Sequence, residues 1–392
     1  MAFEGGTMSD LDSILAAART HAQDVISPQV HDWNEQGQWP RAASDQAAKD
    51  GLLGLYCPPE FGGQGLSLGD GIQVYEELGK GDGAYAFALS MHNICSFALC
   101  GFGTDAAKEK WAKDLTSGKK LAGFVLTEPQ SGSDPMIMHT RANVDGNSGS
   151  YTISGRKAWV SLATEADVYF VVVKTSDEPG HKDMAMIAVP ADAPGVSFGP
   201  RYETASFNFL PLADMYLDNV EVPAENIILP PGKGLSGSLM AIDIARASIA
   251  SGCCGLMEAA LDTALSFAKQ RDMFGGKELD LEGIQWMMAD IATDLEISRL
   301  LYKKAAGLVG TPDGPLAAAH AKRFAPDAAL KAANACTQML GGYGLLKQYD
   351  LDRLSRLAQM LKLVDGTTEI QRVVIARSLI KRSKGLNNVQ MP

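Results

Sequence analysis

The chain has 392 residues, is 46% hydrophobic, and carries 35 Lys and Arg against 46 Asp and Glu, a formal net charge of −11 at pH 7. This acidic balance argues against nucleic-acid binding as the main task, because phosphate backbones are bound by basic surfaces. We find no apolar run of the roughly 18 residues that a membrane span needs, and the N-terminus lacks the pattern of a secretory signal.

The six cysteines form no C-x-x-C pair, and a chain of this size needs no disulfide bonds. We therefore expect a cytoplasmic protein. The six histidines are scattered and no H-E-x-x-H motif occurs, so we expect no metal site.

The hydrophobic pattern changes twice along the chain, from helical to strand-like and back. We place an N-terminal helical domain at 8–120, a β domain at 121–232 and a helical domain at 233–392. Strands do not alternate with helices, so a Rossmann nucleotide domain is not expected. The predicted fold class is α+β, mainly α.

Local composition supports these boundaries. β-branched and aromatic runs predict strands at 151–153, 168–173 and 185–189. Ala/Leu/Met-rich segments predict long helices, which would pack as a four-helix bundle, at 235–270, 283–308, 315–340 and 367–383. A lone G-x-G-x-x-G match at 232–237 lacks a βαβ unit and is interpreted as the link into this bundle.

Residues 124–134 combine a predicted strand with a loop rich in hydroxyl groups and backbone donors. Gly132 lets the backbone of this loop approach a ligand closely. Such a loop can hydrogen-bond the edge of a polar heterocycle, although an ordinary exit from a strand has the same composition.

Trp159 and Ser161 lie two residues apart in a predicted strand, so their side chains point to the same face. An aromatic plane beside a hydroxyl suits a planar tricyclic cofactor. The alternative is a core tryptophan next to a surface serine.

The last domain carries three further signals. Asp243 and Arg246 share one helix face, and Arg271 ends the same predicted helix, where a guanidinium can bind phosphate. The glycines that follow Gln338 exceed what a helix C-cap requires and permit close approach of a ligand or a second chain. Each signal also has a purely structural interpretation. Asp243 and Arg246 can form a salt bridge, Arg271 can be a solvated surface residue, and the glycines can simply end a helix.

Asp365 and Gly366 interrupt two helical runs, and Thr367 can N-cap the second of them, with Glu369 in its first turn. A carboxylate at a helix break can project into a cleft. A simple capping role for the aspartate would fit the local sequence equally well.

Taken together, these segments resemble the acyl-CoA dehydrogenase family over nearly the whole chain. The motifs that carry the resemblance lie, in family order, at 76–79, 127–129, 159, 270–275, 338–344 and 365–372. The resemblance implies an N-terminal helical domain, a central β barrel and a C-terminal four-helix bundle, with FAD between barrel and bundle. It also implies a homotetramer built as a dimer of dimers.

The resemblance further implies roles for individual residues. Asp365 would be the catalytic base. Ser133, Asp243, Arg246 and Gly366 would bind substrate. FAD would be bound by Phe124, Leu126, Thr127, Gly132, Ser133, Trp159, Ser161, Arg271, Phe274, Gln338, Gly341, Gly342, Thr367 and Glu369. Among these, the residues serving the FAD of a neighbouring subunit would be Arg271, Phe274, Gln338 and Gly342.

The implied reaction is α,β-dehydrogenation of an acyl-CoA. The base would remove the α proton while the β hydrogen leaves as hydride to flavin N5, and a desolvated carboxylate with a raised pKa suits that task. The electrons would then pass to an electron-transfer flavoprotein.

The chain departs from the family pattern at several positions. Asp365 stands where the family has glutamate and is shorter by one methylene, about 1.5 Å, while Ala245 occupies the alternative base position of some relatives. Glu282 replaces a cofactor-contacting glutamine. The Arg/Ser/Thr set common before the last barrel strand is replaced by Asn208, Leu210 and Leu212.

These departures leave several reactions open. The first is dehydrogenation of a short, branched or cyclic acyl-CoA. The second is an oxidase resembling nitroalkane oxidase, which also uses aspartate. The third is other chemistry on an acyl thioester, such as desulfination or a carrier-protein-bound substrate, and the last is a non-catalytic member of the family.

Overall fold

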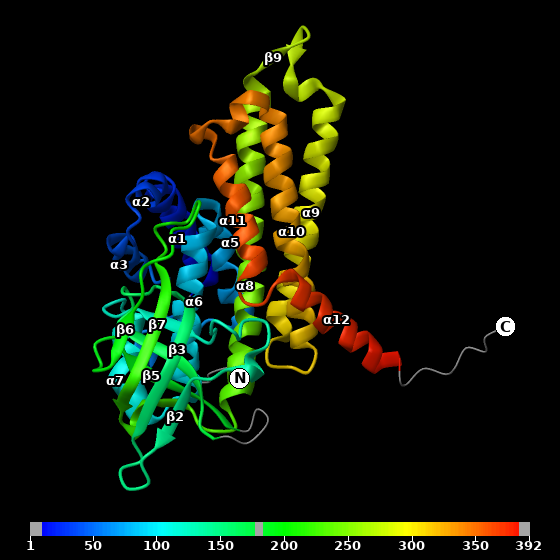
Figure 1. Ribbon diagram of the computed structural model, residues 1–392. Coiled ribbons are helices and arrows are strands. Elements are labelled where there is room, and N and C mark those ends of the chain that lie inside the picture. The colour runs from blue at the N-terminus through cyan, green and yellow to red at the C-terminus, as the bar shows by residue number, and fades with distance from the viewer. Residues whose placement is uncertain (1–9, 177–182, 384–392) are drawn as a thin grey trace, which may run out of the picture.

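The computed structural model describes residues 10–176 and 183–383. Helices, a sheet and a second set of helices follow one another along the chain, and the long helices stand beside the sheet (Figure 1). The N-terminal helices are α1 (Leu11–His21), α2 (Val30–Gln36), α3 (Arg41–Lys49), α4 (Leu68–Gly71), α5 (Val74–Gly81), α6 (Gly83–Phe102) and α7 (Asp105–Thr116).

Helix α6 is the central element of the N-terminal domain. It is apolar on all sides, as expected for a helix surrounded by protein, and nearly all of its residues are buried. Asp82 caps it by accepting a hydrogen bond from the amide of Tyr85 at 2.7 Å. The helix packs on the sheet through residues such as Ala98 and Leu99.

The sheet explains the continuous apolar run at 168–174. The strands are β1 (Ala122–Val125), β2 (Arg141–Val144), β3 (Tyr151–Ser161), β4 (Val168–Lys174), β5 (Met184–Pro190), β6 (Val196–Phe198), β7 (Leu212–Val222) and β8 (Ile227–Leu229). β4 lies in the interior of the sheet, between β5 and the pair β1 and β2. One face of β4 packs on α6 and α7, and the other face packs on buried apolar side chains of other strands. Both faces of β4 are therefore apolar.

Among the described strands, the hydrogen-bonded path runs from β6 through β7, β3, β2, β4 and β5 to β8, and β1 pairs with β4. The expected β barrel is thus one eight-stranded sheet whose ends, β6 and β8, are not paired with each other in that path.

The C-terminal helices are α8 (Gly234–Gln270), α9 (Glu282–Leu308), α10 (Gly314–Leu340), α11 (Leu351–Leu363) and α12 (Thr368–Ser383). The sequence analysis predicted four of them to within one residue at each end but missed α11. Helix α11 packs beside α8 and α10 and completes the bundle, whereas α12 leaves the bundle at an angle (Figure 1). A short hairpin, β9 (Asp272–Met273) and β10 (Gly276–Lys277), caps the end far from the sheet.

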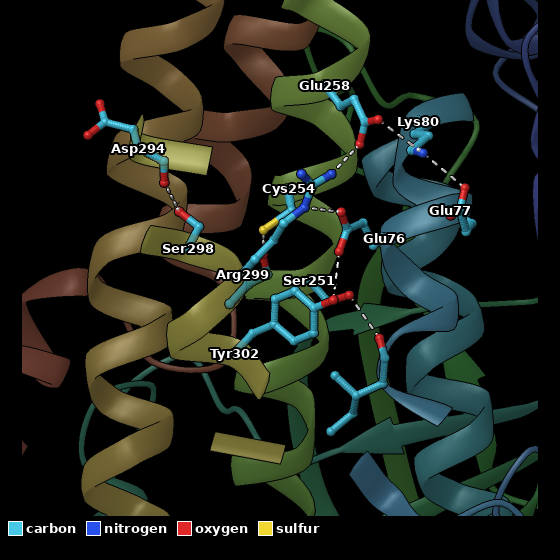
Figure 2. A network of polar contacts seen from close by, with 12 residues as sticks. Glu76, Glu77, Lys80, Ser251, Cys254, Glu258, Asp294, Ser298, Arg299 and Tyr302 are labelled. Carbon is cyan, nitrogen blue, oxygen red and sulfur yellow. Dashed lines mark hydrogen bonds and ion pairs between the residues drawn. The ribbon is translucent and has the colours of Figure 1, made fainter. Parts of the chain in front are cut away.

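A buried polar network joins the N-terminal domain to the bundle, as Figure 2 shows. Glu76 on α5 accepts hydrogen bonds at 2.6 Å from both Arg299 and Tyr302 of α9. Arg299 also donates to Glu258 of α8 at 2.5 Å. The helices come close because Gly255 of α8 lies against α5, where a Cβ atom would stand 2.1 Å from the carbonyl oxygen of Glu76.

Two helices, α6 and α8, are long and apolar enough to cross a membrane by length and composition, which the sequence analysis did not anticipate. Their apolar windows are 89% and 83% buried inside the protein. Buried core helices of soluble proteins have the same composition.

Candidate active site

The turn between α11 and α12 presents Asp365. Its backbone adopts φ +52°, and Gly366 follows at φ +89°, both in the left-handed region that favours glycine and tolerates aspartate. At Gly366 a Cβ atom would lie 3.0 Å from Nε2 of Gln371 and 3.2 Å from Nη2 of Arg246. A side chain at this position would be strained by the backbone conformation and would crowd Gln371 and Arg246. Thr367 caps α12, because its hydroxyl accepts a hydrogen bond from the amide of Ile370 at 3.3 Å, as predicted.

Side chains from neighbouring helices hold the backbone of this turn. Arg246 of α8 donates from Nε to the carbonyl oxygen of Asp365 at 3.2 Å. Gln371 of α12 donates to the carbonyl oxygen of Gly366 at 2.8 Å. The turn is thus held through its carbonyl groups, and the carboxylate of Asp365 is left for another partner.

The carboxylate of Asp365 is desolvated. Its Oδ2 atom is buried and has no hydrogen-bond partner among the described residues. Burial raises the pKa of Asp365 to about 6, and the positive charges of Lys322 and Arg246 oppose that rise. A carboxyl group with this pKa can accept a proton at neutral pH.

A narrow apolar recess opens in front of this carboxylate. Its walls come from α6, β1 and α8, which are distant in sequence. The lining residues are Met91, Ile94, Phe124, Ala241, Ile242, Ala245 and Asp365. Asp365 is the one ionisable group on that lining, and Ala245, at the alternative base position, faces the same space without a carboxylate.

Asp243 and Arg246 lie on one face of α8, as predicted, and form an ion pair of 3.0 Å. Both are nearly buried, at 6% and 8% exposure. Burial raises the pKa of Asp243, and Arg246 opposes this effect. The structural interpretation of these residues, an i,i+3 salt bridge, is therefore confirmed. Arg246 also hydrogen-bonds the carbonyl oxygen of Asp365.

The end of β1 and the loop that follows it lie on the other side of the recess, which Phe124 lines. Phe124, Leu126 and Thr127 are half-buried and Val125 is fully buried, so one edge of the segment remains accessible. Lys157 of β3 supports this segment, donating to the carbonyl oxygen of Leu126 and to Glu128, each at 3.0 Å.

Glu128 stiffens the loop further. It accepts hydrogen bonds from the amides of His139 and Thr140 at 2.6 and 2.9 Å. Burial alone would raise the pKa of Glu128, but Lys157 and these amides lower it to about 2. The loop is thus held by a charge that stays ionised, and Gly132 and Ser133 are exposed farther along it.

Trp159 stands out from β3. A bulge between Lys157 and Val160 places it at φ +57°, and 60% of its surface is exposed. Its ring lies 4.5 Å from that of Tyr202. The core-tryptophan alternative is therefore wrong, and Trp159 offers an aromatic plane on the same strand as the half-buried Ser161.

A second group of predicted cofactor residues gathers at the opposite end of the bundle. Arg271 donates to the carbonyl oxygen of Leu340 at 3.4 Å, beside Gly341 at φ +58°. Phe274, in the hairpin, is 91% exposed. Gln338, Gly341 and Gly342 are also exposed.

The two groups are far apart within one subunit. From Asp243 to Arg271, helix α8 rises by about 40 Å, and the hairpin lies at the tip of the bundle away from the sheet (Figure 1). One bound dinucleotide cannot contact both groups in a single copy of the chain.

The remaining residues that the sequence analysis singled out lie outside the recess. Glu369 is exposed, and hydrogen bonds from its own backbone, Thr368 and Thr367 lower its pKa. Glu282 is exposed at the start of α9, and Leu210 and Leu212 are core residues. Asn208 joins the β domain to α2 through a hydrogen bond from its amide to Asn34 at 2.7 Å.

Sequence reasoning missed much of the recess. Ile94, Ala241 and Ile242 carry no chemical signature, and only the packing of α6 against α8 brings them to Asp365. The buried Lys322 was also missed. Its helical position was predicted, but its neighbours were not.

The residues of the β domain next to the recess suit a flavin. The exposed Trp159 plane and the Ser161 hydroxyl come from β3, and the accessible edge at Leu126 and Thr127 belongs to the segment whose Phe124 lines the recess. The unpartnered carboxylate of Asp365 lines the recess from the bundle side. Among the described residues, no group of three or more His, Cys, Asp or Glu side chains gathers to hold a metal ion.

Comparisons with known proteins agree with this arrangement. Family models match the acyl-CoA dehydrogenase N-terminal domain at 9–119, the middle domain at 123–220 and the C-terminal domain at 232–380. The mitochondrial isobutyryl-CoA dehydrogenase of Dictyostelium discoideum is 32% identical over 96% of this chain and 90% of its own length.

Two further similarities are informative. The cyclohex-1-ene-1-carbonyl-CoA dehydrogenase of Syntrophus aciditrophicus is 32% identical over 95% of this chain and 92% of its own length. The structure of butyryl-CoA dehydrogenase from Megasphaera elsdenii superposes with a TM-score of 0.90 at 30% identity, covering 96% of this chain and all of that one. The chain belongs to the acyl-CoA dehydrogenase family of FAD-dependent oxidoreductases.

Proposed function

We propose that this enzyme dehydrogenates a short, branched or cyclic acyl-CoA between its α and β carbons, with Asp365 as the base. The observation that carries this proposal is the carboxylate of Asp365, whose Oδ2 atom is buried and unpartnered and which lines an apolar recess. FAD, when bound, accepts the β hydrogen as hydride.

The residues of the chain divide the remaining work. Asp365 takes the α proton, because its raised pKa makes the ionised form a competent base at neutral pH. Arg246 keeps the turn in place through the carbonyl oxygen of Asp365. Leu126, Thr127, Trp159 and Ser161 would hold the flavin, and Ser133 and Asp243 would line the path of the thioester.

The recess supports a compact acyl group. It is narrow, and Met91, Ile94 and Ile242 close its walls with large apolar side chains. A base one methylene shorter than glutamate requires a substrate that sits close to it, because near-attack geometry tolerates little displacement. The relatives that act on isobutyryl and cyclohexenecarbonyl thioesters are consistent with such groups.

The enzyme would work as a homotetramer built as a dimer of dimers. The separation of the two groups of cofactor residues supports this, since a neighbouring copy would supply Arg271, Phe274, Gln338 and Gly342. Exposed apolar side chains support it too, because helices α9 and α12 present Trp286, Leu300, Leu379 and Ile380 to solvent. Sedimentation or light scattering would test the assembly.

The decisive experiment mixes the yellow protein anaerobically with panels of acyl-CoAs and nitroalkanes and follows flavin bleaching. We expect bleaching by a short, branched or cyclic acyl-CoA. Bleaching by nitroalkanes alone would establish the oxidase instead, and a protein that takes up no FAD would be a non-catalytic member. The reduced enzyme should then be reoxidised faster by an electron-transfer flavoprotein than by oxygen.

A further inference from the structure

Lys322 of α10 is a buried charge that the reaction itself does not use. Its side chain is fully buried, and an isolated ammonium group is costly to remove from water. Its Nζ atom donates to the carbonyl oxygens of Lys362 at 3.3 Å and of Gly366 at 3.4 Å. These two carbonyls flank Asp365 on either side in sequence.

The position suits a cation for two reasons. The carbonyl of Lys362 belongs to the last turn of α11, where the helix dipole presents its negative end. The carboxylate of Asp365 adds a negative charge nearby. Burial lowers the pKa of Lys322 to about 8, and the attraction of Asp365 works against that fall.

The other charged groups around the turn are already engaged. From α8, Asp243 is paired with Arg246, and the Cys253 thiol is buried with its pKa raised by desolvation to about 12. Asp327 of α10 is paired with Lys362 of α11 at 2.8 Å.

Helix α12 completes the surroundings of the turn with Glu369 and Arg372, which pair with each other at 2.9 Å. The recess walls contributed by α6 and β1 are apolar. Among the described residues, no carboxylate, that of Asp365 included, pairs with Lys322 at 4.0 Å or less, and of the charges that act on Lys322 over a longer range that of Asp365 is the strongest.

We propose that Lys322 is a positioning residue for the base: its ammonium group ties together the two carbonyls that flank Asp365, and its charge keeps that carboxylate ionised inside an apolar recess. This inference rests on the proposed role of Asp365. It adds a residue that touches neither substrate nor flavin but sets the geometry and the protonation of the group that does.

Two substitutions separate the contributions of Lys322. Lys322→Met removes both the charge and the hydrogen bonds, whereas Lys322→Gln removes the charge and keeps a donor. The matched control is Lys331→Met on the same helix, because Lys331 is 60% exposed and pairs with Asp294 at the surface. Circular dichroism and flavin content establish which variants fold.

The protonation of Asp365 is read directly as the infrared carboxyl band that appears on acidification and is absent from Asp365→Asn. We expect the apparent pKa of this band to rise by about one to three units in both Lys322 variants, as for a carboxylate that loses a nearby opposite charge. The acid limb of the pH profile for flavin reduction should move by the same amount. Lys331→Met should leave both unchanged.

The outcomes are distinct. An unchanged carboxyl pKa in a folded, FAD-containing Lys322→Gln variant would overturn the inference. A shifted band in an enzyme whose flavin no acyl-CoA bleaches would instead remove the proposed function and leave the Lys322–Asp365 coupling standing. At high pH the carboxylate is ionised in both variants, so only its position can differ between them. Faster flavin reduction by Lys322→Gln than by Lys322→Met would then show that the hydrogen bonds position the turn.

Discussion

Glu76 and the Oδ2 atom of Asp365 are both buried, but their surroundings are opposite. Each oxygen of Glu76 accepts a 2.6 Å hydrogen bond, from Arg299 and from Tyr302 (Figure 2). Oδ2 of Asp365 accepts none among the described residues. A paired carboxylate ties helices together, whereas an unpaired one costs stability and is kept where its reactivity is needed.

The same contrast appears in how the neighbouring cations are used. Arg299 points its guanidinium at the carboxylates of Glu76 and Glu258. Arg246 pairs with Asp243 and donates to the carbonyl oxygen of Asp365, and Lys322 donates to two further carbonyls of the turn, so neither donates to the carboxylate of Asp365. The bundle thus holds the turn of Asp365 without occupying its carboxylate, and three substitutions with four expected effects test this division.

The largest expected effect is the loss of proton abstraction in Asp365→Asn. The amide keeps the size of the side chain but cannot accept the α proton, and general-base catalysis contributes about 10²- to 10⁴-fold. We expect flavin reduction by the best acyl-CoA to slow by about 10³-fold in stopped-flow measurements, with FAD content unchanged. Normal bleaching would remove Asp365 from the role of base.

Asp365→Glu tests the reach of the base. The added methylene moves the carboxylate by about 1.5 Å, and a displacement of about 1 Å costs roughly 10²-fold. We expect about 10²-fold slower reduction by the native substrate, with a smaller penalty or a gain for bulkier acyl groups. An equal effect on all acyl-CoAs would show that the shorter base does not select the substrate.

The unpartnered carboxylate also predicts how stability depends on pH. Because the pKa of Asp365 is raised from 3.8 to about 6 in the folded state, the folded protein binds more protons than the unfolded chain between these values. Its contribution to stability therefore falls as pH rises through that window. We expect Asp365→Asn to be more stable than wild type by about 2–3 kcal/mol at pH 7.5.

The stability difference between Asp365→Asn and wild type should vanish below about pH 4, as Asp365 becomes protonated in the unfolded chain as well as in the folded protein. Chemical denaturation at several pH values measures it. A constant difference between the two proteins at all pH values would contradict the raised pKa.

The smallest of the four effects is expected at Glu76. Glu76→Gln keeps the shape but weakens two charge-assisted hydrogen bonds, which should lower the free energy of unfolding by about 1.5–2 kcal/mol. Flavin reduction should change little, since Glu76 lies outside the recess. The control is Glu35→Gln, because Glu35 pairs with Lys347 at the surface and should show no measurable change.

The sequence alone determined the order of helical and strand segments and the positions of several elements. Helical periodicity placed α8 at 235–270 against the observed Gly234–Gln270, and the apolar run at 168–173 marked β4. The motif at 365–372 was enough to single out Asp365. Such features are local, so composition and spacing carry them. The amphipathic pattern of α11 was readable too but was overlooked.

Only the tertiary structure decided which of these residues meet. It joined Met91 of α6 and Ala245 of α8 into one recess with Asp365, separated Arg271 from that recess, and buried Lys322 against the carbonyls of the turn. Local periodicity defines the face of a helix but not its partner. Desolvation, which raises the pKa of Asp365, depends on neighbours that are distant in sequence.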